Sequence, residues 1–172
     1  KRKKLPRSDI TKLTLENGPE IYLKKTDFKK DEIQLEAFSY GGFSTASLDK
    51  LASAKYAEDV LSYADLGEIS VVEKENLFQE NFVDVFPIIT EGGEGVTGKS
   101  NNENLENMLK MIYLNFTDLR VKQNHIDRFK EIKINQYYID KENPKHQSDL
   151  EYRKKLYQDH PRTQYPTDEV FN

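Results

Sequence analysis

The sequence predicts an α+β domain in which a mostly antiparallel sheet of about five or six strands carries helices packed on one face. Two observations lead to this class. Alternating apolar residues around an Asn-Gly pair indicate a β-hairpin near the N-terminus, whereas apolar residues at steps of three and four dominate the second half of the chain. The length of 172 residues and the apolar fraction of 36%, with ten Tyr and nine Phe, are sufficient for one packed core.

The two ends of the chain have the composition of connectors. Residues 1–9 carry a run of charges interrupted by proline before any apolar alternation begins, and residues 161–172 contain two further prolines. We therefore expect an incoming linker over residues 1–9, a single domain over residues 10–160 and an outgoing linker over residues 161–172. These ends also lead us to expect that the chain is a piece of a longer protein.

The first strands follow from period-two alternation. Leu13 and Leu15 alternate with polar neighbours, Asn17-Gly18 tolerates positive φ, and the alternation resumes over residues 21–23, which predicts a hairpin. A third strand is expected from about Glu32 to Ser39. The pair Gly41-Gly42 then predicts a tight loop.

The middle of the chain predicts two helices and a strand. Helical spacing of apolar residues runs from about Leu48 to Leu66, and Gly67 is placed to cap that helix. A second, short helix is expected over residues 70–79, with Ser70 as its N-terminal cap. Residues 82–89 read as a strand, and the proline within them favours an edge position.

The second half of the chain predicts a return strand and three helices. A turn at residues 91–93 leads into a strand over residues 95–99, and Ser100 to Glu103 have the form of a capping box for the helix that follows. That helix carries a continuous apolar stripe, made by Leu105, Met108, Leu109, Ile112, Tyr113 and Phe116. Two further helices are expected over residues 123–140 and from Pro144 to near His160.

The composition excludes several classes of function. The chain has no cysteine, which removes disulfides, thiolate catalysis and cysteine zinc sites. No apolar run reaches the ~20 residues that span a bilayer, and no signal peptide opens the chain. The net charge is −4, although residues 1–30 hold ten Lys or Arg against four Asp or Glu. Because the basic cluster at residues 1–4 lacks interleaved aromatic residues, we interpret it as a solvated linker and expect no nucleic-acid partner.

Common catalytic motifs are also absent from the sequence. There is no G-x-S-x-G elbow and no P-loop, and the glycines between residues 92 and 95 are better explained by a hairpin turn. The three histidines, His125, His146 and His160, have no partner histidine at helical spacing. We interpret each of them as a surface or packing residue.

Several segments follow one another in a distinctive order and spacing along the chain. They are Leu15–Gly18 before Ile21–Lys24, Thr26–Ile33, Ser39–Ser44, Thr90–Glu91, Gly98–Ser100, Tyr113–Thr117 and His160–Arg162. This ordered set resembles the pitrilysin/insulinase family of zinc metallopeptidases, and in particular a non-catalytic, inactive domain of its bacterial exported members. The resemblance covers roughly residues 11 to 165 and implies the α+β fold of the metallopeptidase-like domains of that family.

The resemblance implies that the metal motif of the family is degenerate in this chain. Active members carry H-x-x-E-H on the first long helix, with two histidines on zinc and the glutamate as general base. Matched residue by residue, the histidine positions hold Lys55 and Asp59, and Glu58 keeps the position of the base. A lysine ammonium has no free lone pair for a metal. Glu131 lies near the region of a third acidic ligand, but its register does not support that assignment.

We therefore expect no catalytic residue, no metal and no cofactor in this chain, with zinc in a catalytic half. That half would lie in the same polypeptide or in a partner subunit, and this domain would help to enclose and position a peptide substrate. Alone the chain would not be an enzyme, yet it would form part of a zinc metalloendopeptidase. The alternative is a structural or interaction module derived from the same family. The compartment is open, and the resemblance favours export to the periplasm.

An ordinary structural interpretation of the three motif positions stands beside this one. Lys55 and Asp59 lie four residues apart, and such an ion pair on a helix contributes a few tenths of a kcal/mol. Glu58 alone is the kind of residue that a solvated helix face carries.

Overall fold

The computed structural model describes residues 1–171 and divides them into two compact units, residues 1–32 and residues 33–171. Each unit is described by itself. The limits expected for the domain, at residues 10 and 160, remain a prediction.

The first unit is a small antiparallel sheet in the order β1-β2-β3, formed by Arg2–Lys4, Ile10–Thr14 and Glu20–Lys24. Leu13 pairs with Ile21 across β2 and β3. The turn between these strands closes with a 2.9 Å hydrogen bond from the Leu15 N–H to the Pro19 carbonyl, and Gly18 adopts a φ of +106°. The predicted hairpin is therefore confirmed.

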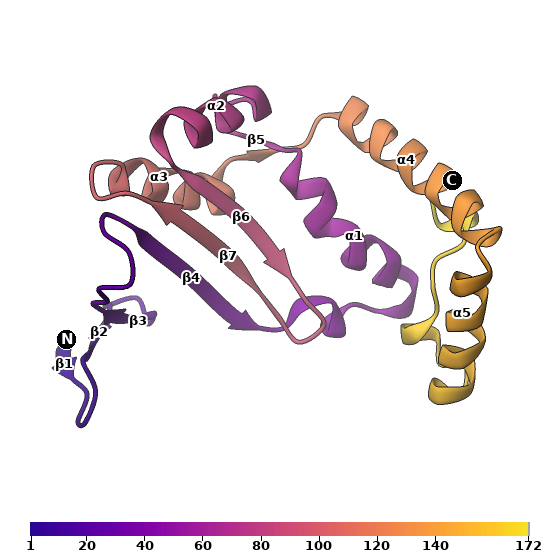
Figure 1. Ribbon diagram of the computed structural model, residues 1–172, viewed down its shortest axis with the longest axis horizontal. Coiled ribbons are helices and arrows are strands. Elements are labelled where there is room, and N and C mark those ends of the chain that lie inside the picture. Colours follow the sequence, from indigo (N-terminus) through magenta and orange to yellow (C-terminus); the bar gives the residue numbers. More distant parts are fainter. Residues whose placement is uncertain (172) are drawn as a thin grey trace. The chain divides into compact units, whose positions relative to one another are not determined.

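The second unit is built on a three-stranded antiparallel sheet in the order β4-β7-β6 (Figure 1). Its strands are β4 (Ile33–Tyr40), β6 (Asp84–Ile89) and β7 (Gly93–Ser100). A further pair of short antiparallel strands joins β5 (Asp65–Leu66) to β8 (Leu119–Arg120). The predicted strand from residue 82 is an edge strand, as Pro87 suggested.

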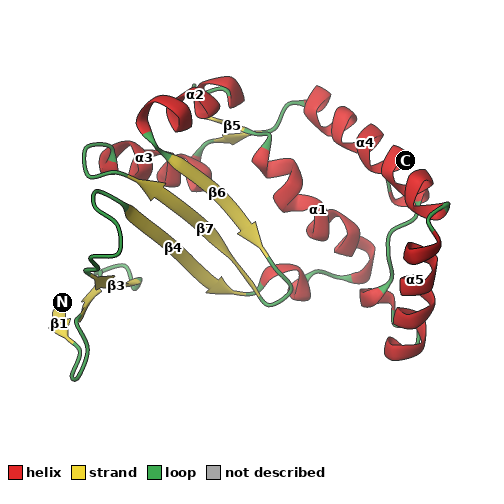
Figure 2. Cartoon of the chain, in the orientation of Figure 1, coloured by secondary structure: helices red, strands yellow, loops and turns green. Residues whose placement is uncertain are grey.

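Five α-helices complete the described part of the second unit (Figure 2). They are α1 (Leu51–Ser62), α2 (Val71–Asn81), α3 (Leu105–Thr117), α4 (Gln123–Lys141) and α5 (Pro144–Tyr157). The predicted α+β class is confirmed, and the eight strands in residues 1–171 lie in three antiparallel sheets.

The core lies between the sheet and the helices. Val85 of β6 and Val96 of β7 face Met108 and Met111 of α3, and all four side chains are buried. Gly98 permits this close approach, because a Cβ at that position would lie 2.9 Å from the Met108 Sδ. The other face of the sheet carries exposed aromatic side chains, namely Phe38, Tyr40 and Phe86.

The first helix ends earlier than its periodicity predicts, at Ser62 rather than near Leu66. The Lys74 ammonium donates hydrogen bonds to the carbonyls of Ser62 and Ala64 and so caps the helix. Gly67 does not cap α1 but turns the chain at φ +58°, where its N–H donates to the Asp118 carbonyl at 2.7 Å. Pairing of β5 with β8, which lies more than fifty residues away, overrides the local pattern.

The two predicted N-terminal caps have opposite outcomes. Ser70 caps α2 in a full capping box with Glu73, whose pKa is lowered by hydrogen bonds from the Ser70 hydroxyl and N–H. Ser100 instead ends β7, where it pairs with Ile33, and its side chain is buried. The prediction of a capping box at residues 100–103 is therefore wrong, because Ser100 pairs with β4 as the last residue of β7.

Candidate functional site

The three motif positions lie in the middle of α1, and each side chain contacts a different element. α1 forms because small and helix-favouring residues fill this segment, and Leu51 at its start is buried. Lys55 contacts the segment after α5, Glu58 contacts β6, and Asp59 contacts α4. The site is therefore a junction of four parts of the second unit.

Lys55 is bound to the chain beyond α5. Its Nζ donates a 2.7 Å hydrogen bond to the Arg162 carbonyl. The Arg162 guanidinium in turn donates to the Ala46 carbonyl at 2.6 Å and, less closely, to the Phe43 carbonyl. Burial lowers the pKa of Lys55, and the nearby positive charges of Arg153 and Arg162 lower it further. Lys55 thus connects the first helix to the end of the chain.

Glu58, at the position of the general base, accepts a hydrogen bond from the backbone of the sheet. Its Oε2 lies 2.6 Å from the N–H of Ile89, the last residue of β6. This N–H points away from β7, since a side chain outside the sheet binds it. Bonds of this kind to a charged acceptor contribute about 1.5–3 kcal/mol, so the carboxylate has a structural role before any chemical one.

The hydrogen bond that Glu58 accepts lies on the outward edge of β6, where few backbone N–H groups remain for another strand. Alternation along β6 directs the N–H positions of Val85 and Pro87 to the same side as that of Ile89. Proline has no N–H to present there. Burial raises the pKa of Asp84, and the neighbouring Val85 backbone lowers it to a smaller extent. The outward positions of Pro87 and Ile89 are thereby closed.

Asp59 forms an ion pair with α4, its Oδ2 lying 2.9 Å from the Lys133 Nζ. The same ammonium lies 5.1 and 5.3 Å from the ring centres of Tyr56 and Phe129. Phe171 completes this aromatic cluster. Burial is also the main cause of a raised pKa of the Tyr56 hydroxyl.

These residues do not fit a zinc site. Among residues 1–171, no three His, Cys, Asp or Glu side chains are grouped so as to hold a metal ion. Lys55 offers a protonated nitrogen, and the Glu58 and Asp59 carboxylates point to different partners. Glu131 is exposed on α4.

The three histidines are likewise separate. A ring nitrogen of His125 lies 2.8 Å from the Tyr63 carbonyl, and the ring of His146 meets that of Tyr165 edge to face. His160 Nδ1 accepts a hydrogen bond from the Arg162 N–H. Each histidine therefore serves local packing or a turn.

The opposite edge of the sheet has a different character. β4 has no second strand partner within residues 33–171. Ile89 and Ser39 both pair with Glu94 of β7, so the alternation directs Ser39 toward β7 and the main-chain groups of Phe38 and Tyr40 away from it. The side chains of Phe38 and Tyr40 are 58% and 90% exposed on the outer face. Within residues 33–171, no strand pairs with this edge.

Sequence reasoning missed the partners of the motif residues. Lys133, Arg162 and Ile89 lie 74, 107 and 31 residues from the side chains that they bind. No local pattern reveals such pairs. The one available signal was the segment His160–Arg162, which carried the family resemblance without indicating its contact.

A search for membrane-crossing segments in residues 1–171 found no helix with the length and apolar character that a bilayer requires.

Comparison with known proteins supports the resemblance that the sequence indicates. The chain is 21% identical over 124 residues to the probable zinc protease PqqL of Haemophilus influenzae. The aligned region covers 72% of this chain but only 13% of that protein. No protein-family model matches the chain. The chain thus spans a small part of the curated relative.

Solved structures give the same fold. The periplasmic protease PqqL from Escherichia coli aligns with a TM-score of 0.84 and 18% identity, covering 99% of this chain and 19% of that one. A peptidase M16 inactive domain from Pseudomonas fluorescens aligns with a TM-score of 0.73 and 17% identity, covering 92% of this chain and 38% of that one. The chain therefore has the fold of these solved structures, as the sequence resemblance predicts.

Proposed function

We propose that this chain is a non-catalytic domain of a pitrilysin-like zinc peptidase, in which another part of the polypeptide or a partner subunit holds zinc and hydrolyses the peptide. The observation that carries the proposal is the hydrogen bond of Glu58 to Ile89, beside a lysine at a metal-ligand position. A carboxylate held by the sheet, without a metal to activate water, has no reaction to promote. The inactive-domain fold supports the same conclusion.

The role of this domain would be to enclose and position the peptide. An extended peptide can add as a strand to an exposed sheet edge, where main-chain hydrogen bonds supply affinity. The β4 edge offers such main-chain groups beside Phe38 and Tyr40, whereas the β6 edge is closed. We therefore propose that the peptide lies along β4.

The cellular compartment follows by analogy. The Escherichia coli relative is described as a periplasmic protease. We propose that the protein that contains this chain is exported in the same way.

The test compares Glu58 variants in the full-length protein. Glu58→Gln keeps an oxygen for the Ile89 N–H but removes the base. We expect its peptidase kcat to stay within twofold of the parent and its zinc content to stay unchanged, with Glu131→Gln as a matched acidic control. General bases contribute about 10²–10⁴-fold to a rate. A hundredfold loss of kcat in a folded Glu58→Gln protein would show that this domain is catalytic.

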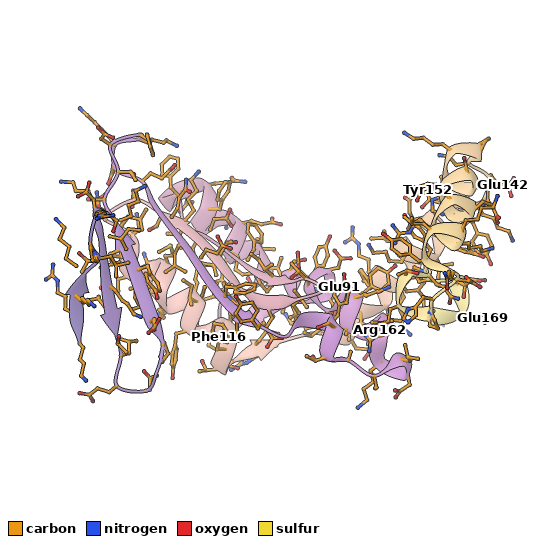
Figure 3. The ribbon with its side chains drawn as sticks, turned by 90° about the horizontal axis from the view of Figure 1, so that it is seen from below. Glu91, Phe116, Glu142, Tyr152, Arg162 and Glu169 are labelled. Carbon is orange, nitrogen blue, oxygen red and sulfur yellow. The ribbon has the colours of Figure 1, made fainter. Side chains whose placement is uncertain are left out.

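One observation favours the alternative of an interaction module without a peptidase role. The outer side of α3 exposes Leu109, Tyr113 and Phe116, the last at 70% (Figure 3). An apolar stripe of this kind is typical of a surface that another domain covers. A full-length protein and partners without any H-x-x-E-H segment, and without peptidase activity, would favour this alternative.

A further inference from the structure

A pocket of about 530 Å³ lies between α4, α5 and the segment that follows α5. Its walls combine aromatic and apolar side chains, with Tyr137, Leu150, Tyr165 and Phe171 among them, with polar and charged ones. Its volume lies in the range of small-ligand sites. The motif residues of α1 do not line it.

Arg153 of α5 is the unusual polar group in this pocket. Its guanidinium lies over two rings, with its carbon 5.0 Å from the centre of Tyr165 and 5.5 Å from that of Tyr157. Its one protein hydrogen bond is long, 3.4 Å from Nη2 to the Thr163 carbonyl, and its Nε is buried without a partner. No carboxylate in residues 1–171 lies within ion-pair distance of the Arg153 guanidinium. Because arginine is always charged, the pocket wall carries a fixed cation without a counter-ion.

The other charged groups near the pocket have partners of their own. Lys133 is paired with Asp59, and Lys154 lies 3.3 Å from Glu151. The positive charge of Arg153 also reaches Lys55, where it contributes, after burial, to the lowered pKa of that ammonium.

Acidic groups line the same pocket and limit what it can accept. Asp140 accepts a hydrogen bond from Gln136 at 2.9 Å, and Asp159 accepts one from Gln164 at 3.2 Å. These two carboxylates would repel a doubly charged phosphate more strongly than a singly charged carboxylate, so they favour a carboxylate as the anion on Arg153.

We propose that this pocket binds the C-terminal residue of a peptide, with its carboxylate on the Arg153 guanidinium and its side chain between the aromatic walls. Planar guanidinium groups match carboxylates well, and the contacts with two rings restrict the orientations open to Arg153. The inference goes beyond the proposed function, because this binding requires neither zinc nor hydrolysis.

The experiment follows binding to the full-length protein by ¹⁹F NMR with N-acetyl-4-fluorophenylalanine and with its C-terminal amide. We expect the acid to bind at least tenfold more tightly than the amide. Arg153→Gln should abolish that preference, Arg153→Lys should retain part of it, and the exposed α4 control Arg128→Gln should keep all of it. Peptidase activity is not measured, so this result and that of the Glu58 test are independent.

Three outcomes would overturn the proposal. One is equal affinity for the acid and the amide, and another is an unchanged preference in a folded Arg153→Gln protein. Equally tight binding of N-acetylglutamate α-amide, whose carboxylate is on the side chain, would exclude the chain end as the source. If Arg153→Gln does not fold, Gln136→Trp fills the pocket from the surface of α4. We expect it to weaken binding of the acid at least tenfold, and unchanged binding would contradict the site.

Discussion

The two edge strands of the sheet in residues 33–171 differ in what their backbones present. Along β6, one outward position is a proline without an N–H, and the N–H of another, Ile89, is bound by the Glu58 carboxylate from α1. Along β4, the outward main-chain groups of Phe38 and Tyr40 have no strand partner in this unit. Unprotected edges invite strand addition, and natural proteins usually block them. The two edges of this sheet therefore differ in how readily they could accept a further strand.

The comparison also shows what the three motif positions do in this fold. Glu58 binds the β6 edge, Asp59 pairs with α4, and Lys55 binds the segment beyond α5. The side chains at these positions of α1 therefore make contacts within the unit.

The strongest way to break the comparison is to disrupt β7, which both edge strands share. In Gly95→Ala the new Cβ would overlap the Ala37 carbonyl oxygen on β4. We therefore expect the free energy of unfolding to fall by about 3 kcal/mol. Faster hydrogen exchange of residues 84–100 in the full-length protein measures it. Gly92→Ala, where a Cβ meets nothing within 4 Å, should change the stability by less than about 0.5 kcal/mol. Equal effects of the two substitutions would contradict this packing.

Opening the closed edge is the next largest change. Glu58→Ala leaves the Ile89 N–H without its acceptor, at a cost of about 1–2 kcal/mol, or roughly tenfold faster exchange of the Ile89 amide. Glu58→Gln retains an acceptor and should keep most of the protection. If exchange at Ile89 is the same in both variants, the carboxylate does not close this edge.

The charge of Asp84 gives a smaller, pH-dependent effect. Because burial raises the pKa of this carboxyl, the folded state holds a proton more readily than the unfolded chain, and ionisation destabilises the fold. Asp84→Asn should therefore be more stable at pH 7, by less than about 1 kcal/mol. The advantage shrinks as the pH falls through the raised pKa. Urea unfolding at pH 7 and pH 4 checks the sign, with Glu36→Gln on the open edge as a control.

The open edge should tolerate change in the folded state. Tyr40 is 90% exposed, so Tyr40→Lys should alter stability by no more than about 0.5 kcal/mol. Lysine discourages strand addition, and we expect extended peptides to bind the full-length protein several-fold more weakly. Tyr152→Lys, on an exposed face of α5, should leave peptide affinity unchanged (Figure 3). Equal peptide affinity of the Tyr40→Lys and Tyr152→Lys proteins would contradict peptide binding along β4.

The sequence predicts the elements whose signals are local. Asn17-Gly18 gives the hairpin, Ser70 with Glu73 gives the cap of α2, and Pro87 places its strand at an edge. The end of α1 and the role of Ser100 could not be predicted in this way. Pairing with β8 and with β4 decides them, and a window of ten residues contains neither partner.

For the site on α1, the sequence predicts the chemical character of the side chains but not their partners. An ammonium at a ligand position argues against zinc from the sequence alone. The partners that Lys55, Glu58 and Asp59 contact lie between 31 and 107 residues away along the chain, and the fold alone brings them together. Arg153 carries no motif at all, and its significance comes only from the two rings that hold it.

The bond between Lys55 and the Arg162 carbonyl sets an order of events on the ribosome. The two residues are separated by 107 positions, and Arg162 also holds Phe43 and Ala46, which precede α1. At about 5–20 residues per second, the first helix waits roughly 5–20 s after it emerges before this contact can form. During that interval nascent α1 can contact only the strands that have already been synthesised. The hydrogen bond between Glu58 and β6 can therefore form before the one between Lys55 and Arg162.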